Sequence, residues 1–172
     1  MRRHSREAAS EEARERIGRV IDRVLAIGLA HDQLSFKKGA SSVDMRDYLK
    51  ALCANIDPRR LNLTIATEFD SASIPLDRAV PIGLILNELV TNSVKYAFDE
   101  EGGVINIMFR VNETIGEAEL CVRDNGRGMG SARSGSLGLR LVESLSRQLG
   151  GRLTTAKVPK ATKTVLTVPY SV

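Results

Sequence analysis

The sequence predicts an α/β sandwich in which helices cover one face of a mixed β-sheet. Two kinds of segment support this fold class. Segments with helical spacing of apolar residues, and segments in which apolar and polar residues alternate, follow each other in the order helix, helix, strand, helix, two strands, helix, two strands. The length of 172 residues suits one domain with a sizeable core. With 42% hydrophobic and 27% charged residues, the chain has the composition of a globular protein rather than of a disordered tail.

The first region, residues 1–38, is expected to form one long amphipathic helix. Ser10 is a suitable N-cap, because the two glutamates that follow it would then lie in the first turn, where negative charge is favourable. An apolar stripe at helical spacing continues to His31. It contains Ala13, Ile17, Val20, Ile21, Val24 and Leu25. Nothing else in this region covers the stripe, so we expect it to pack on a partner helix, on another chain or on a further segment.

Residues 39–172 contain the remaining elements and are expected to form a second, larger unit. Ser41 and Asp44 form a capping-box pattern before a helix expected at about 43–56. Two further helices are expected at 77–98 and 137–149, and strands at 61–69, 103–111, 118–123, 152–157 and 163–169.

Composition also argues against several classes of protein. Cys53 and Cys121 lie far apart and are the only cysteines, so neither a disulfide framework nor a CxxC zinc site is expected. No apolar run reaches the roughly 20 residues needed to cross a bilayer, and the N-terminus is charged where a signal peptide would be apolar. We therefore expect a cytoplasmic protein without a membrane segment. The net charge of +4 favours anionic partners only weakly, and a chain with no Trp, three Tyr and four Phe is not expected to stack on nucleic acid.

A polar edge on the helix expected at 77–98 is a candidate functional feature. At about 100° per residue, Glu88, Asn92 and Lys95 share an arc of about 60° beside an apolar arc. The apolar arc contains Ile82, Ile85, Leu86, Leu89 and Ser93. An amide oxygen suits a hard cation such as Mg²⁺, and a nearby carboxylate can hold a water or accept a proton. The alternative is an ordinary solvated face with a charge pair at i,i+3 or i,i+4 spacing.

Two glycine-bearing segments follow this helix. Residues 124–129, Asp-Asn-Gly-Arg-Gly-Met, come directly after an expected strand, and their glycines let the backbone turn sharply and approach a ligand closely. Asp124 can accept a hydrogen bond from an exocyclic amine such as that of adenine. Residues 134–139, Ser-Gly-Ser-Leu-Gly-Leu, open a helix whose N-terminal amides can bind phosphate. Each segment alone fits a plain turn, but together with the polar edge they favour a nucleotide site.

These segments resemble the motifs of a known family, the GHKL ATPase superfamily. The run ELVTNSVKY resembles its N box, DNGRG its first glycine box and SGSLGL its second glycine box. Thr162 resembles the late Thr of the family. The longer stretches IPLDRAVPIGLILNELVTNSVKYAF and SLGLRLVESLSRQLGG resemble the bacterial sensor histidine kinases of the HWE type and their sister group. Because Asn87 stands where the HWE signature has a His, and the chain has no Trp, the sister group is nearer.

The resemblance covers about residues 10–172 and implies a Bergerat ATP-binding fold. Glu88 would be the catalytic carboxylate, and Asn92 would bind an Mg²⁺ ion that bridges the phosphates. Asp124 would recognise the adenine amine, and Thr162 would support Asp124 through a hydrogen bond. The other implied nucleotide-binding positions are Lys95 and Tyr96 near phosphate or ribose, Gly126, Gly128 and Met129 beside the base, and Gly135, Ser136, Leu137 and Gly138 at a short lid.

The implied activity is that of an ATP-dependent protein histidine kinase, which transfers the γ-phosphoryl group of ATP to a histidine for relay to a response regulator. Two alternatives stay open. One is a Ser/Thr protein kinase on the same fold, similar to anti-sigma factors, whose phosphoserine product would be stable in acid. The other is a degenerate module that binds a response regulator without ATP, for which Ser136 in the second glycine box leaves room.

The phosphoacceptor is not evident from the sequence. Residues 10–34 resemble the second dimerisation helix of the family, whereas the acceptor histidine belongs to the helix before it. His4 lacks the sequence context of that histidine, and His31 lies on the apolar stripe, where a packed or partly buried side chain is expected. We therefore expect the acceptor in an upstream segment or in another protein, and a possible homodimer through the N-terminal helix.

Overall fold

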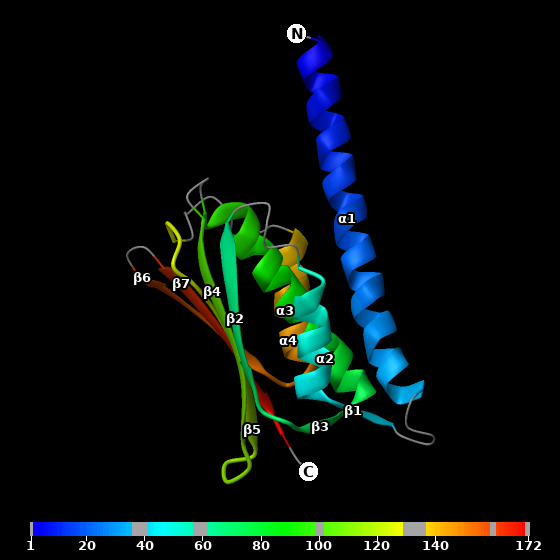
Figure 1. The fold of residues 1–172 in the computed structure, drawn as a ribbon, viewed down its shortest axis with the longest axis vertical. Coiled ribbons are helices and arrows are strands. Elements are labelled where there is room, and N and C mark those ends of the chain that lie inside the picture. Colours follow the sequence, from blue (N-terminus) through cyan, green and yellow to red (C-terminus); the bar gives the residue numbers. More distant parts are fainter. Residues whose placement is uncertain are drawn as a thin grey trace.

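In the described part of the chain, helices cover one face of a five-stranded mixed sheet (Figure 1). The predicted α/β sandwich is therefore confirmed. The structure, a computed structural model, describes residues 2–35, 41–56, 62–98, 102–128, 137–158 and 161–170.

The sheet has the strand order β2-β4-β5-β7-β6, in which only the β2–β4 pair is parallel. Its strands are β2 (Leu63–Phe69), β4 (Gly103–Asn112), β5 (Glu117–Asp124), β6 (Arg152–Val158) and β7 (Ala161–Pro169). Buried and more exposed residues alternate along β4, as expected for a sheet that is covered on one face. The register places Asp124, the last residue of β5, opposite Thr162 near the start of β7.

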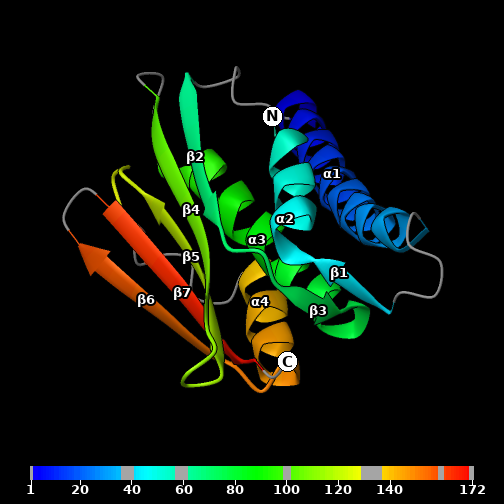
Figure 2. The same ribbon diagram turned by 60° about the horizontal axis from the view of Figure 1, so that its bottom comes forward.

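The described residues form four helices, all on the covered side of the sheet. They are α1 (Arg2–Ser35), α2 (Met45–Ala54), α3 (Leu76–Tyr96) and α4 (Leu137–Gln148). Helices α2, α3 and α4 lie next to the sheet, and α1 lies outside them against α2 and α3 (Figure 2). None of the helices in the described ranges combines the length and the apolar character needed to cross a lipid bilayer.

The core lies between α3 and the sheet. The apolar arc predicted for this helix is buried: Ile82, Ile85, Leu86 and Leu89 are at most 5% exposed. They belong to the same core as strand residues such as Ile107, Phe109 and Leu120. Full burial of a side chain of this size stabilises a fold by about 1.5–3 kcal/mol. This packing fixes the orientation of α3 and therefore the direction in which its polar edge faces.

Helix α1 begins earlier than expected. Its helical backbone runs from Arg2, so Ser10 lies inside the helix and does not cap it. The residues before Ser10 include two alanines and no Gly or Pro, and such a sequence favours continuation of a helix.

The start of α2 also differs from the expectation. The N-cap is Asp44, whose side chain accepts a hydrogen bond from the Asp47 N–H (3.2 Å), and Ser41 is not the cap. The reason is a small antiparallel sheet, β1 (Ser42–Asp44) with β3 (Ser73–Pro75), which keeps the residues before Asp44 extended. Sequence patterns did not indicate either three-residue strand.

The apolar stripe predicted for α1 is exposed. Ile17, Val20, Ile21 and Val24 are each more than half exposed, whereas Ala26 and Ala30, which are fully buried against the domain, lie on the opposite face of the helix. His31 is exposed, so the expected packed or partly buried position for this side chain was wrong. The face that packs on α2 and α3 carries Asp22 and Arg23 as well as the two alanines, so the domain leaves the predicted stripe uncovered.

Candidate functional site

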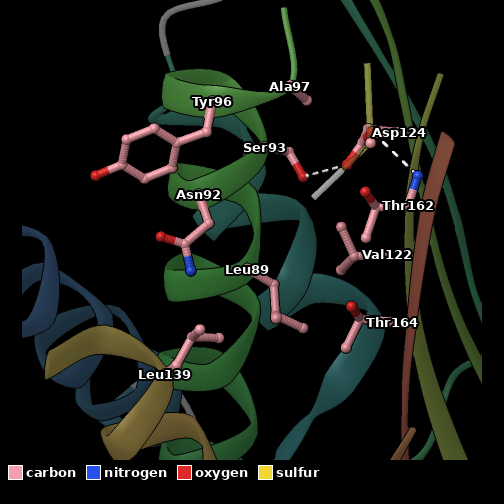
Figure 3. A pocket seen from close by; sticks show the side chains of 11 residues that line it. Leu89, Asn92, Ser93, Tyr96, Ala97, Val122, Asp124, Leu139, Thr162 and Thr164 are labelled. Atoms are coloured by element: carbon pink, nitrogen blue, oxygen red, sulfur yellow. Dashed lines mark hydrogen bonds between the residues drawn. The ribbon is translucent and has the colours of Figure 1, made fainter. Parts of the chain in front are cut away.

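A pocket opens between α3, the first turn of α4 and the ends of β5 and β7 (Figure 3). Apolar side chains, including Leu89, Val122 and Leu139, form much of its wall. The full lining is Leu89, Asn92, Ser93, Tyr96, Ala97, Val122, Asp124, Gly128, Leu139, Thr162 and Thr164. A mainly apolar cleft with a few convergent polar groups is typical of a small-molecule site.

Asp124 is the charged residue among those that line this pocket, and it is only 3% exposed. Its Oδ2 accepts a hydrogen bond from the Ser93 hydroxyl (3.0 Å). Its Oδ1 accepts from the backbone N–H groups of Gly126 (3.2 Å) and Thr162 (3.3 Å). A carboxylate offers about four lone-pair positions, so these three bonds leave one for a donor on a ligand. Thr162 thus contacts Asp124 as expected, through its backbone rather than its hydroxyl.

Ser93 is a site residue that sequence reasoning did not select. It lies on the buried arc of α3, and Figure 3 shows its hydroxyl turned toward Asp124 while the neighbouring Asn92 leaves the helix in another direction. A hydroxyl on an otherwise apolar arc needs a buried partner, because an unpaired one is costly. A serine on an apolar arc was therefore the sequence feature that could have indicated a buried partner for Ser93.

The backbone path of the loop after β5 requires glycine at two positions. A Cβ at Gly126 would lie 2.1 Å from the carbonyl oxygen of Ala97, at the end of α3. The same oxygen accepts a hydrogen bond from the Arg127 N–H (2.8 Å), so the loop backbone lies directly on the helix end. Gly128 has a φ of +82°, a conformation that residues with a side chain rarely adopt. Both glycines therefore shape the wall beside Asp124.

The expected lid lies mostly outside the described residues. Met129, Gly135 and Ser136 fall outside them, and of Leu137 the structure describes only that α4 begins there. Gly138 is buried, and a Cβ at this position would be 2.5 Å from Glu88 Oε2. The start of α4 therefore lies against the polar edge of α3.

The three residues of that polar edge have different environments. Asn92 is half-buried and lines the pocket, next to Tyr96 and Leu139 (Figure 3). Lys95 is half-buried but does not line it. Glu88 is 5% exposed and also lies outside the pocket lining. A solvated face is therefore ruled out for Glu88.

Glu88 is held by α1. Its Oε1 accepts hydrogen bonds from both Arg23 Nε (3.0 Å) and Arg23 Nη2 (2.5 Å). Asp22 precedes Arg23 on α1, and partial burial raises the pKa of its carboxyl. The positive charge of Lys95 opposes this shift, and the negative charge of Glu88 adds to it. Asp22 thus lies close to two residues of the polar edge.

Comparison with known proteins identifies the family. The model of the family described as "Histidine kinase-, DNA gyrase B-, and HSP90-like ATPase" matches residues 77–172, which is more than half of the chain. The chain belongs to this ATPase family. A second family model, described as "Histidine kinase", matches residues 1–58 of the chain. The resemblance to sensor histidine kinases is thereby confirmed.

Named relatives of the chain agree with that assignment. "Sensor histidine kinase PdtaS" of Mycolicibacterium smegmatis is 29% identical over 98% of this chain and 36% of the relative. "Blue-light-activated histidine kinase 2" of Erythrobacter litoralis is 27% identical over 87% of this chain and 46% of the relative. The chain therefore spans less than half of either protein. A solved histidine kinase domain from Erythrobacter litoralis has a TM-score of 0.81 and 25% identity, over 88% of this chain and 74% of that domain.

Proposed function

We propose that this histidine kinase-like ATPase binds Mg·ATP in the pocket beside Asp124 and transfers the γ-phosphoryl group to a histidine, for relay to an aspartate of a response regulator. The buried carboxylate of Asp124, with three hydrogen bonds and one lone-pair position left, is the observation that supports this proposal most strongly. The family and the relatives named sensor histidine kinases support the same reaction class.

Asp124 would select the base. A carboxylate that is held by three donors offers a fixed acceptor, which suits the exocyclic amine of adenine and repels a keto oxygen at the same position. The apolar wall formed by Leu89 and Val122 would enclose the flat faces of the ring. Because Gly126 and Thr162 donate from the backbone, their bonds hold Asp124 in place before a ligand binds.

The phosphates would lie toward Asn92 and the start of α4. Mg²⁺ takes oxygen ligands, keeps several waters and often binds phosphate oxygens together with one or two protein groups, so the amide oxygen of Asn92 fits this ion. Bound there, Mg²⁺ would neutralise charge on the phosphates. Tyr96 lines the same pocket, and Lys95 belongs to the polar edge just outside the pocket lining, so this proposal puts both near phosphate or ribose.

Glu88 would act at the acceptor histidine. In the transfer, a nitrogen of the imidazole forms a bond to the γ-phosphorus, the bond from that phosphorus to the β–γ bridging oxygen breaks, and ADP leaves. The carboxylate of Glu88 would accept the imidazole proton, as a general base placed next to the nucleophile. The phosphoryl group would then pass from the histidine nitrogen to the aspartate of the regulator.

The acceptor and the partners also belong to the proposal. We place the acceptor histidine in an upstream segment or in another protein, and not at His4 or at the exposed His31 of α1. The exposed apolar residues of α1, among them Ile17 and Val24, would pair with a second copy of the chain.

Calorimetric titration with Mg²⁺ and a non-hydrolysable ATP analogue tests the nucleotide site. The parent chain should bind one equivalent. Asp124→Asn should weaken this binding by about 10- to 100-fold, because a hydrogen bond to a charged group contributes roughly 1.5–3 kcal/mol. Inorganic triphosphate, which has no base, should lose much less affinity. The matched control is Asp32→Asn at an exposed position of α1, which should bind like the parent.

Three results would contradict the proposal or redirect it. Equal losses for the analogue and triphosphate would remove the base contact from Asp124. No binding at millimolar analogue would favour a module that binds a regulator without ATP. A phosphorylated product that survives acid would indicate transfer to serine or threonine, since phosphohistidine is labile in acid.

A further inference from the structure

Helix α1 lies across the edge of α3 that carries Glu88, and three contacts hold it there. Arg23 donates two hydrogen bonds to Glu88, and the Asn87 side-chain amide donates one to the Asp22 carbonyl oxygen (3.2 Å). The hydroxyl of the fully buried Tyr48 donates to the Ala26 carbonyl oxygen (3.0 Å). All three contacts fall within about one turn of α1.

This arrangement encloses both oxygens of Glu88. Oε1 accepts both hydrogen bonds from the guanidinium of Arg23. Oε2 lies next to Gly138, where an added Cβ would be only 2.5 Å from this oxygen. Helix α1 covers one side of the carboxylate and the start of α4 covers the other, so only 5% of Glu88 is exposed. An incoming nucleophile therefore reaches this carboxylate only if one of the two moves, and the Arg23 contact is the one that holds α1 in place.

The charges near Glu88 show why α1 depends on Arg23. The carboxylate of Asp22, one residue before Arg23, lies close enough to Glu88 that the negative charge of Glu88 raises the pKa of Asp22. Lys95 opposes the effect at Asp22, and Arg23 neutralises Glu88 directly. Because the Arg23–Glu88 pair is largely shielded from water, solvent screens it less than an exposed pair. Without the guanidinium, two carboxylates would face each other across the α1–α3 contact.

We propose that Arg23 is a positioning residue for Glu88, and that it withholds this carboxylate from the reaction while α1 is docked. The proposal rests on the proposed function, in which Glu88 is the general base. Release of the Arg23–Glu88 pair, by a movement of α1 relative to α3, would free the carboxylate to accept a proton. The position of α1 thus controls phosphoryl transfer without changing the nucleotide pocket, whose lining excludes both residues.

The test compares hydrolysis of Mg·ATP, in which water takes the place of the acceptor histidine that we place outside this chain, in the parent chain and its variants, with released ADP as the measured product. Arg23→Gln should raise kcat by at least about fivefold and leave KM within about twofold, because the affected interaction controls the reactive group and not nucleotide binding. Arg23→Lys keeps the charge and should stay close to the parent. The control Arg14→Gln removes the same charge from an exposed position of α1 and should change neither constant.

Two further variants separate this role from a general loosening of the structure. Adding Glu88→Gln to Arg23→Gln should abolish the gain, because the gain depends on the freed carboxylate. Tyr48→Phe removes the bond to Ala26 without touching Glu88 and should also raise kcat. In Arg23→Gln, amide hydrogen exchange at Asp22–Ala26 should be faster than in the parent, while exchange in β4 and β5 stays unchanged.

An unchanged or lower kcat in a folded Arg23→Gln chain that still binds the analogue would overturn the proposal, and so would a gain that survives Glu88→Gln. If the parent binds no Mg²⁺-bound analogue, the proposed function itself fails, and the role of Arg23 fails with it. The titration and the kcat comparison therefore identify which of the two is wrong.

Discussion

Replacement of Gly126 by Ala is the perturbation for which the geometry gives the sharpest expectation. The added Cβ would lie 2.1 Å from the Ala97 carbonyl oxygen and 2.6 Å from its carbonyl carbon. Both are backbone atoms that cannot rotate away, so the loop itself has to shift. The shift disrupts the bond from the Arg127 N–H to Ala97 (2.8 Å) and the bond from the Gly126 N–H to Asp124 (3.2 Å).

The expected loss follows from these contacts. Overpacking costs about 1–3 kcal/mol, and each lost hydrogen bond adds roughly 0.5–1.5 kcal/mol. We therefore expect a loss of about 2–4 kcal/mol in the free energy of unfolding, which for a chain of this size lowers Tm by roughly 5–15 °C. Affinity for the Mg²⁺-bound analogue should fall at least about tenfold, since Asp124 loses one of its three donors.

The measurements are thermal unfolding followed by circular dichroism and calorimetric titration of each variant. The matched control is Gly28→Ala, on α1 between the buried residues Ala26 and Ala30, where a Cβ meets no atom within 4 Å. Alanine is better than glycine in a helix by about 0.5–1 kcal/mol, so this variant should gain a few degrees in Tm and keep its affinity. Parent-like Tm and affinity in Gly126→Ala would refute the close approach of the loop to α3.

Other expectations concern the metal and the thiols. Asn92→Ala should abolish the Mg²⁺-dependent part of nucleotide affinity. It should leave Tm within a few degrees of the parent, because the side chain is only half-buried. If the titration shows unchanged Mg²⁺ dependence, Asn92 is not the metal ligand. Burial raises the pKa of Cys53 from 9.0 to about 12, so at pH 8 its thiolate fraction falls about a thousandfold. Iodoacetamide should therefore label the native chain far more slowly than the chain in urea, with mass spectrometry as the readout; similar rates would contradict the burial of this thiol.

The parts of the fold that sequence patterns predicted are those with a local repeat. The period of α3 showed which arc is buried, since Ile82, Ile85 and Leu86 recur at helical spacing and face the sheet. The alternation along β4 and β5 likewise predicted these strands. By contrast, β1 and β3 have three residues each, and a pattern with a period of two cannot be recognised over so short a run.

The parts of the site that sequence reasoning missed depend on contacts between distant residues. Ser93 and Asp124 are 31 residues apart, and Arg23 and Glu88 are 65 residues apart. The helical spacing placed Glu88 on a polar edge, but the burial of that edge comes from α1, whose position on α3 no local pattern contains. Residue type indicated the chemistry of each group, and tertiary packing determined its partner.

The environment of Asp124 shows how far the site depends on the register of the sheet. Its three donors come from α3, from the loop after β5 and from β7, and the last is present because Asp124 lies opposite Thr162. A slip of β7 by one residue would put Ala161 or Lys163 at this position and would turn the side chains of β7 to the other face of the sheet. Helix α3 alone supplies only Ser93, which satisfies one oxygen of the carboxylate. Substitutions that weaken the pairing of β5 with β7 should therefore reduce nucleotide affinity even where they lie far from the pocket.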